Sequence, residues 1–173
     1  MDYDKLITER YSVRKFEDRP LSEEDVNKIL QAGHVAPTGC NCQPQRILVI
    51  NSESAIEKLK NCTKCHFGTK TAFLVCHNES ESWVRPYDGA LASPIDATIV
   101  ATHMMLKAHE IGVGCCWVMY FEPEKLIKEF NIPSNIKPLA ILVMGYPAAD
   151  AKPLYMHDEK RPLSEVVSYN EFS

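Results

Sequence analysis

Apolar residues in the first third of the chain recur at helical spacing. Residues 22–25, Ser-Glu-Glu-Asp, are close to the capping box that starts many helices. The face of a helix that follows them carries Val26, Ile29, Leu30 and Gly33. The loop signal Pro-Thr-Gly at residues 37–39 then ends the pattern. This stretch therefore predicts one amphipathic helix that packs on a core.

Short apolar runs further along the chain predict β-strands at residues 46–50, 72–76, 115–118 and 139–144. The first run is predicted to be buried, and the unbroken last run is typical of a strand covered on both faces. A short helix with Ile56 and Leu59 separates the first two strands, and Glu122-Pro123 opens a helix before the last one. This mixture predicts an α+β or α/β fold, with residues 1–173 forming a single domain.

Residues 95–111 are apolar around more than one helical face, unlike a helix that lies on a protein surface. The pattern predicts a central helix that is buried on several sides and shared with a second subunit. Residues 78–94, which are polar and contain Pro and Gly, predict a long loop. Residues 148–173 are polar with Val166-Val167 as their only apolar anchor, which is typical of a tail that packs on a partner.

Composition is that of a globular protein, with 45% hydrophobic and 24% charged residues among 173. A net charge of −4 favours neither a nucleic-acid partner nor an anionic membrane. No apolar run reaches the roughly 18 residues of a membrane span. The opening sequence MDYDKLITERYSVRKF lacks the apolar region of a signal peptide, so we expect a cytoplasmic location with free thiols at the seven cysteines.

The sequence Cys62-Thr63-Lys64-Cys65-His66 matches the C-x-x-C-H pattern of covalent haem attachment. Such attachment normally takes place outside the cytoplasm, so haem is not expected. Together with Cys40 and Cys42 the segment forms a C-x-C and a C-x-x-C, which is not a usual zinc-ribbon pairing. We therefore expect no metal site and assign these residues as incidental thiols.

Common catalytic signatures are missing from the sequence. Gly112-Val113-Gly114 begins a dinucleotide fingerprint, but Trp117 occupies the third glycine position and the segment follows a helix. No phosphate-binding P-loop, no G-x-S-x-G and no H-E-x-x-H occurs. His103 and His109 are six residues apart, which does not place them on one helical face as ligands.

Arg10, Ser12 and Arg14 lie close together in the segment Arg-Tyr-Ser-Val-Arg. Two guanidinium forks and a hydroxyl can converge on one phosphate group. The alternative is a solvated basic turn that is balanced by neighbouring acids, namely Asp2, Asp4, Glu9 and Glu17. The segment alone leaves both interpretations open.

Five segments, taken in order, resemble the signatures of the nitroreductase family of FMN flavoproteins. They are residues 10–16, 36–44, 96–105 with 112–117, 145–147 and 160–163. The first resembles R-x-S-x-R-x-F and the second resembles A-P-S-x-x-N-x-Q-P-W. The resemblance implies an α+β fold, a three-layer α/β/α sandwich with a central mixed, mainly antiparallel sheet. It also implies an intertwined homodimer whose termini cross to the partner.

The resemblance further implies which residues hold FMN. Arg10, Ser12 and Arg161 would hold the phosphate, with Lys160 as a weaker candidate, and Tyr11 is a further cofactor-binding residue. Arg14 would lie towards the pyrimidine edge or the ribityl chain. A loop from the neighbouring subunit would contribute Pro37, Thr38, Gly39 and Asn41. The backbone at Met119 and Tyr120 would face flavin N5.

The chain departs from the family pattern in places that bear on the substrate. Gln45 stands where the family usually has Trp, which changes one wall of the site. Tyr120 replaces a glycine beside the N5 contact and narrows the substrate channel. The cation near flavin O2 is either Arg14 or Lys70.

The implied function is hydride transfer from NADH or NADPH through flavin N5 to a nitroaromatic, a quinone or a similar electron-poor acceptor, by ping-pong turnover. No side-chain nucleophile is required, because the flavin supplies the chemistry. Two alternatives stay open. One is a divergent reaction of the flavin-destructase or reductive-dehalogenase type, and the other is a flavin-binding or cysteine redox-sensing module without turnover.

Overall fold

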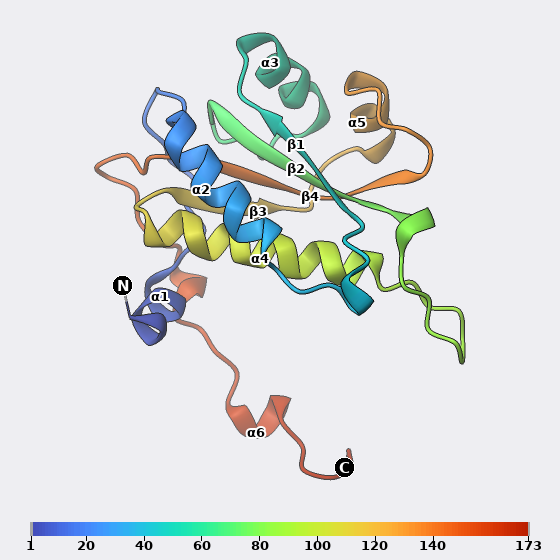
Figure 1. Ribbon diagram of the computed structural model, residues 1–173. Coiled ribbons are helices and arrows are strands. Elements are labelled where there is room, and N and C mark those ends of the chain that lie inside the picture. Colours follow the sequence, from blue (N-terminus) through green and yellow to red (C-terminus); the bar gives the residue numbers. More distant parts are fainter. Residues whose placement is uncertain (1, 173) are drawn as a thin grey trace.

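The computed structural model describes residues 2–172 as one sheet with helices on both faces (Figure 1). Its helices and strands are α1 Tyr3–Glu9, α2 Glu23–His34, β1 Gln45–Ile50, α3 Glu53–Cys62, β2 Thr71–Asn78, α4 Ser93–Glu110, β3 Gly114–Val118, α5 Pro123–Glu129, β4 Ile136–Gly145 and α6 Leu163–Val166. Short 3-10 turns occupy Gly39–Asn41, Glu79–Glu81 and Tyr155–His157. Each strand and helix that the apolar patterns predict is present, with slightly different ends.

The strands form one sheet in the order β1-β2-β4-β3. Every neighbouring pair of these strands is antiparallel. A parallel contact occurs outside them, as an isolated bridge between Ser12 and Cys115. β2 is buried along its whole length, and β4 is buried from Ala140 onward, because both have strands on either side. The predicted mainly antiparallel central sheet is confirmed.

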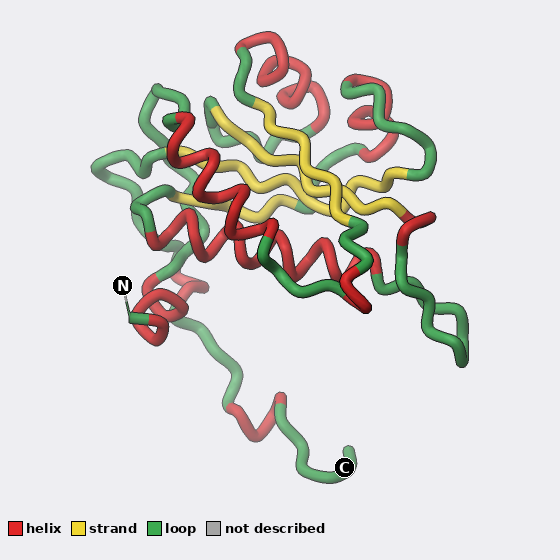
Figure 2. Tube along the Cα trace, in the orientation of Figure 1, coloured by secondary structure: helices red, strands yellow, loops and turns green. Residues whose placement is uncertain are grey.

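Helices cover both faces of this sheet and give the predicted three layers (Figure 2). α2 and α4 pack on one face, and α3 and α5 pack on the other. Side chains alternate along a strand, so β2 contributes to two separate cores. Phe73 and Val75 pack with α2 and α4, whereas Leu74 and Cys76 pack with α3 and α5.

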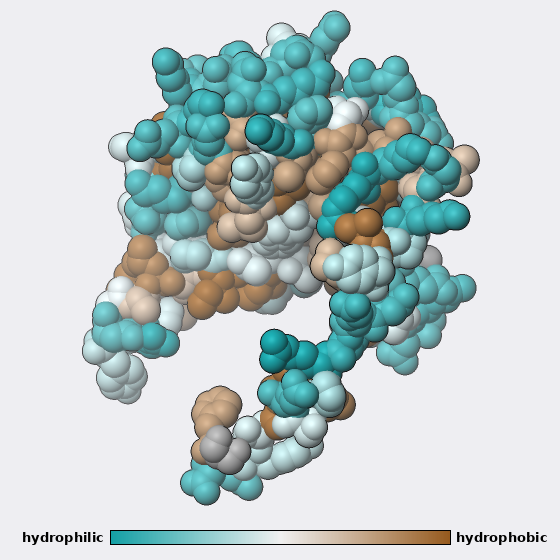
Figure 3. All heavy atoms as spheres, turned by 180° about the vertical axis from the view of Figure 1, so that it is seen from behind, coloured by the Kyte–Doolittle hydropathy of each residue, from teal (hydrophilic) through white to brown (hydrophobic). Residues whose placement is uncertain are grey.

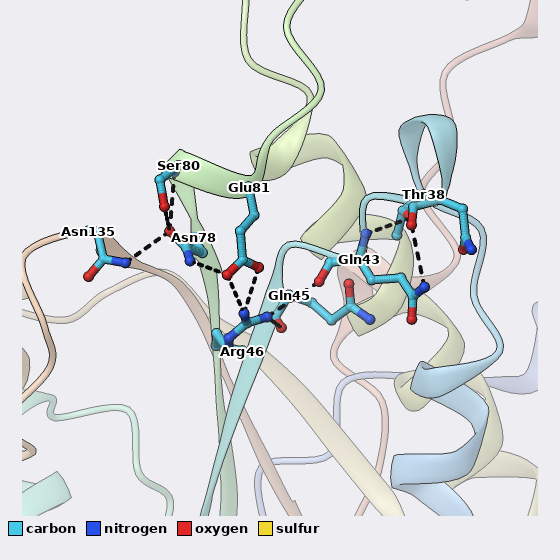
Figure 4. A network of polar contacts seen from close by, with 9 residues as sticks. Thr38, Gln43, Gln45, Arg46, Asn78, Ser80, Glu81 and Asn135 are labelled. Carbon is cyan, nitrogen blue, oxygen red and sulfur yellow. Dashed lines mark hydrogen bonds and ion pairs between the residues drawn. The ribbon is translucent and has the colours of Figure 1, made fainter.

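β1 is an edge strand, and the prediction that residues 46–50 are buried is wrong for most of its length. Leu48 is 40% exposed. Arg46 is exposed as well and forms an ion pair of 2.6 Å with Glu81, close to Asn78 (Figure 4). An apolar run predicts a strand, but its burial depends on which strands flank it in the sheet.

α4 is buried along one face only within the chain, so the predicted burial on several sides is not met by a single copy. The buried face packs on α2, where Gly33 lets Met104 and Val100 approach closely. A Cβ added at Gly33 would lie 2.8 Å from Cγ of Met104. On the rest of the helix Ile95 is 64% exposed, and Met105 is half-buried. Neither α4 nor any other helix in the described part of the chain has the length and apolarity to cross a membrane.

The C-terminal segment leaves the body of the molecule after residue 160 (Figure 1). Figure 3 shows its end as an arm that stands away from the body, with apolar surface on the body across the gap. Val166 and Val167 are exposed within this chain, so the prediction that they anchor the segment on a partner stays a prediction. The segment carries several exposed apolar side chains, namely Leu154, Tyr155, Met156, Leu163, Val166, Val167, Tyr169 and Phe172.

The start of α2 forms half of the predicted capping box. The Ser22 hydroxyl accepts the N–H of Asp25 at 3.1 Å. The backbone N–H of Ser22 donates to the Tyr146 hydroxyl at 3.3 Å instead of to Asp25, and that hydroxyl donates to the Asp25 carboxylate at 2.6 Å. Tyr146 thereby ties the first turn of α2 to the end of β4.

Candidate functional site

Residues 10–14 follow α1 and lie against the start of β3. The N–H of Val13 donates to the carbonyl of Cys115 at 3.0 Å, next to the parallel bridge at Ser12. Val13 is 2% exposed and packs on Gly114, where an added Cβ would lie 2.8 Å from the Val13 side chain. Side chains alternate along extended backbone, so burying Val13 turns its two neighbours to the opposite side.

A pocket of about 210 Å³ opens beside this segment. Its walls come from two distant parts of the sequence, with Arg10, Tyr11, Ser12 and Arg14 on one side and Leu154, Met156, His157 and Lys160 on the other. The Tyr11 hydroxyl donates to the carbonyl of Ala151 at 3.4 Å. The rings of Tyr11 and His157 meet edge to face, with centroids 6.3 Å apart. These contacts fold the residues after β4 back over the N-terminal segment.

The cations in this pocket have no carboxylate partner within residues 2–172. Nearby carboxylates pair with other cations: Glu9 with Lys5, Glu17 with Arg19, Asp150 with Lys15, and Glu165 with Arg161. Arg10, Arg14 and Lys160 therefore concentrate positive charge in one hollow, beside the Ser12 hydroxyl. Because guanidinium forks and hydroxyl donors suit a phosphate, this arrangement favours an anion site over the alternative of an internally balanced basic turn.

Two groups below the pocket respond to this charge. Burial lowers the pKa of His109 near the end of α4, and the positive charge of Arg10 lowers it further. Burial raises the pKa of the Cys116 thiol in β3, while Arg14 and Ser12 act in the opposite direction. Arg10 and Arg14 therefore act electrostatically on the interior directly beneath the segment that carries them.

The structure ranks the candidate cations differently from the sequence. Lys160, the weaker candidate, lines the pocket and donates to the carbonyl of His157. Arg161 does not line it, and its largely exposed guanidinium lies 3.9 Å from Glu165 of α6. Lys70 forms an ion pair of 2.8 Å with Asp18 and does not line the pocket. Of the two cations considered for flavin O2, only Arg14 lies at the pocket.

Sequence reasoning did not identify three of the lining residues, namely Leu154, Met156 and His157. The available signal was a short apolar cluster at residues 154–156 in an otherwise polar segment. That cluster indicates packing somewhere, but it does not say against which part of the chain.

Met119 and Tyr120 lie just past the other end of β3, and both are exposed. The carbonyl of Tyr120 accepts the Thr63 hydroxyl, which ties this end of the strand to the end of α3. Cys115 lies beneath the pocket, and Met119 is four positions further along the extended chain. The two are therefore about 13 Å apart. An elongated ligand with its anionic end in the pocket can therefore run along β3 towards Met119.

The turn at residues 37–43 lies at the opposite end of α4 from the pocket. The N–H of Gly39 donates to Oδ1 of Asp96 in the first turn of α4 at 2.8 Å. His109, which lies next to Arg10, is thirteen positions after Asp96 in α4. The distance between the two along the helix axis is therefore about 20 Å. A single chain therefore does not bring Thr38 and Asn41 to the pocket.

The cysteines of the C-x-C and C-x-x-C segments lie in different environments. No group of three or more His, Cys, Asp or Glu side chains among residues 2–172 is arranged to hold a metal ion. Cys40 and Cys42 are exposed, whereas Cys62 is buried and its thiol donates to the carbonyl of Lys58 at 3.3 Å.

Comparison with known proteins extends over almost the whole chain. The model of the nitroreductase family matches residues 7–72 and 60–146. A protein of Archaeoglobus fulgidus named "Putative NADH dehydrogenase/NAD(P)H nitroreductase" is 30% identical over 165 residues, covering 90% of this chain and 91% of that protein.

Solved structures agree in fold. A nitroreductase family protein from Clostridium difficile 630 superposes with a TM-score of 0.93 at 39% identity, covering 99% of this chain and 100% of its own. An FMN-dependent nitroreductase from Clostridium difficile R20291 has the same fold, with a TM-score of 0.79 at 23% identity, covering 98% of this chain and 99% of its own.

Proposed function

This chain belongs to the nitroreductase family, and we propose that it is an FMN-dependent oxidoreductase that moves hydride from NADH or NADPH to a small electron-poor acceptor. The pocket at residues 10–14 supports this most directly. Arg10, Arg14 and Lys160 meet there without a carboxylate partner among residues 2–172. A dianionic phosphate would compensate their charge. The names of the Archaeoglobus relative and of the FMN-dependent structural neighbour agree with this assignment.

The donor set fits the phosphate end of FMN. Guanidinium groups donate in pairs to phosphate oxygens, and Lys160 and the Ser12 hydroxyl add further donors. Met119 and Tyr120 are exposed and lie past the far end of β3 from this pocket, where the ring system of the cofactor would extend. The chain thus offers an anion-binding pocket beside the start of β3 and exposed residues beyond its end.

When bound, FMN supplies hydride transfer at its N5 atom. The protein supplies position and charge. Arg10, Ser12 and Lys160 anchor the phosphate. Arg14 places a positive charge near the pocket mouth, which favours a cofactor state that carries more negative charge. Tyr120 narrows the approach for an acceptor that enters after the nicotinamide has left, as ping-pong turnover requires.

The proposal includes a homodimer with sites shared between chains. The turn that carries Thr38 and Asn41 lies about 20 Å from the pocket of its own chain, measured along α4. A second copy related by a two-fold axis can bring the turn of one chain to the pocket of the other. The exposed apolar side chains of α4 and of the C-terminal segment provide surface for such a contact.

The visible spectrum of the purified protein tests the cofactor assignment. We expect two flavin bands, and heat should release FMN at about one per chain because the pocket presents one phosphate site. A haem Soret band, FAD in place of FMN, or a colourless protein that binds no added FMN would contradict the proposal.

Steady-state oxidation of NADH and NADPH with a quinone or a nitroaromatic then tests turnover. A protein that binds FMN but oxidises neither nucleotide would instead favour a flavin-binding or redox-sensing module.

A further inference from the structure

We propose that Asp96 is a positioning residue that sets the turn carrying Thr38 and Asn41. The inference rests on the proposed function, because that turn is assigned to the cofactor of the neighbouring subunit. Asp96 itself touches neither cofactor nor acceptor in this assignment. It acts through the backbone of Gly39.

The contact is part-buried, with Asp96 as its buried side, and joins α4 to a distant loop. Asp96 is 3% exposed, and its Oδ1 accepts the N–H of Gly39 at 2.8 Å. Asp96 lies in the first turn of α4, and its Oδ1 is bonded to a loop far away in the sequence. Gly39 is half-buried, and a Cβ added there would lie 3.4 Å from the side chains of Trp83 and Ala92.

The turn needs such an external contact because its backbone is strained. Cys40, Asn41 and Gln43 have φ angles of 48°, 57° and 51°, in the left-handed region that costs a non-glycine residue free energy. The hydrogen bonds within the turn are local. The N–H of Asn41 donates to the carbonyl of Thr38 at 2.9 Å, and the N–H of Gln43 donates to the Thr38 hydroxyl at 3.1 Å (Figure 4).

At the end of the turn that continues into β1, Arg46 donates to the carbonyl of Gln43 at 3.3 Å. Among residues 38–42, the bond from Gly39 to Asp96 is the described hydrogen bond to another element of the fold. The part of the turn that carries Thr38 and Asn41 is therefore tied to the fold through Asp96. The Asp96 bond fixes the turn relative to α4, and hence relative to any partner that packs on α4.

The second carboxylate oxygen strengthens the case for a positioning role. Oδ2 of Asp96 is buried and has no hydrogen-bond partner among the described residues. An unpartnered buried carboxylate oxygen lowers stability, so the residue is not optimised for folding alone. The partial positive charge at the N-terminus of α4, an 18-residue helix, offsets part of that cost.

The experiment compares four variants of the FMN-loaded protein. Asp96→Ala removes the acceptor, and Asp96→Ser leaves a hydroxyl too short to reach Gly39, in case the alanine variant fails to fold. Asp96→Asn keeps an oxygen acceptor without the charge. Asp25→Ala is the matched control, because it removes a first-turn carboxylate that holds Tyr146 at 2.6 Å far from the turn.

Amide hydrogen exchange in a peptide covering residues 36–44 is the direct readout, and the FMN dissociation constant is the second. Asp96→Ala and Asp96→Ser should each raise exchange in this peptide, and should weaken FMN binding about tenfold, because a part-buried bond to a charged group is lost. In Asp96→Asn, amide exchange at residues 36–44 and the FMN dissociation constant should both be close to those of the wild type. Asp25→Ala should change neither, although it lowers the thermal midpoint.

Unchanged exchange at residues 36–44 in Asp96→Ala or Asp96→Ser would overturn the inference. Raised exchange with an unchanged FMN dissociation constant would overturn the positioning role, because the turn would then move without effect on the cofactor. A wild-type protein that binds no FMN would refute the proposed function itself. That failure needs no variant, so it is distinguishable from failure of the role of Asp96.

Discussion

At the C-terminal end of α4 three cations line a pocket without a carboxylate partner in residues 2–172, whereas at the N-terminal end the polar groups bond mainly to one another. The first end comprises Arg10, Arg14 and Lys160. The second comprises the turn at residues 38–43 with Asp96, and nearby His77, whose Nδ1 lies 3.0 Å from the Ser93 hydroxyl.

The difference shows how one helix can serve two purposes. At one end the chain leaves charge uncompensated, which favours a ligand of opposite charge. At the other end it uses buried polar groups to hold its own backbone in a strained shape. Because the ends lie about 20 Å apart, a site that needs both requires two chains.

The largest expected effect is the activity recovered when two inactive variants are mixed, one altered at each end of α4. Arg10→Ala alters the pocket end and Asn41→Ala alters the turn, so each homodimer should be nearly inactive. If the two ends meet across a dimer, a 1:1 mixture after subunit exchange should recover about a quarter of wild-type activity, because half of the dimers are mixed and each has one intact site. NADH- and NADPH-dependent quinone reduction measures it.

Two controls accompany the mixing experiment. Each variant is also mixed with itself, and subunit exchange is verified by mass. If the mixture is no more active than the self-mixtures, both ends belong to one site within a single chain. A wild-type protein that sediments as a monomer with FMN bound would lead to the same conclusion.

Lys160→Ala and Arg161→Ala test which cation of the tail serves the pocket. Lys160 lines it, so its loss should weaken FMN binding about tenfold, the cost of one charge-assisted contact. Arg161 lies near Glu165 outside the pocket, so its loss should change binding by no more than about twofold. Fluorescence titration with FMN measures both constants. A larger effect at Arg161 than at Lys160 would support the ranking from sequence and contradict the one from structure.

Acidification should lower the stability of the folded protein through His77 and His109, one near each end of α4. This effect should be smaller than those of the variants above. Burial lowers the pKa of His77, and burial together with Arg10 lowers the pKa of His109. Each therefore stays neutral to a lower pH in the folded protein than in the unfolded chain, which takes up a proton below about pH 6.5. Stability is full above that pH and declines as the pH falls towards the folded pKa values.

Thermal midpoints between pH 7 and pH 5 measure this decline. His109→Gln should flatten the profile, whereas His34→Gln, at an exposed position at the end of α2, should leave it unchanged. If the thermal midpoint falls equally with pH in wild type and in His109→Gln, the proposed effect of Arg10 on His109 is contradicted.

The helices and strands could be predicted from the sequence because they depend on local spacing. The apolar run of β2, the helical face of α2 and Pro123 at the start of α5 are each visible within a few residues. Arg10, Ser12 and Arg14 were found in the same way, since their convergence follows from one extended segment.

Contacts between distant segments could not be predicted in this way. Whether Lys160 or Arg161 reaches the pocket depends on how the residues after β4 fold back on Tyr11. The exposure of β1 depends on its place at the edge of the sheet, and the bond from Asp96 to Gly39 joins residues 57 positions apart. By itself, the sequence determined the secondary elements and the chemistry available at residues 10–14. Only the tertiary structure decided which side chains share a pocket, because long-range packing selects among contacts that local patterns leave equally possible.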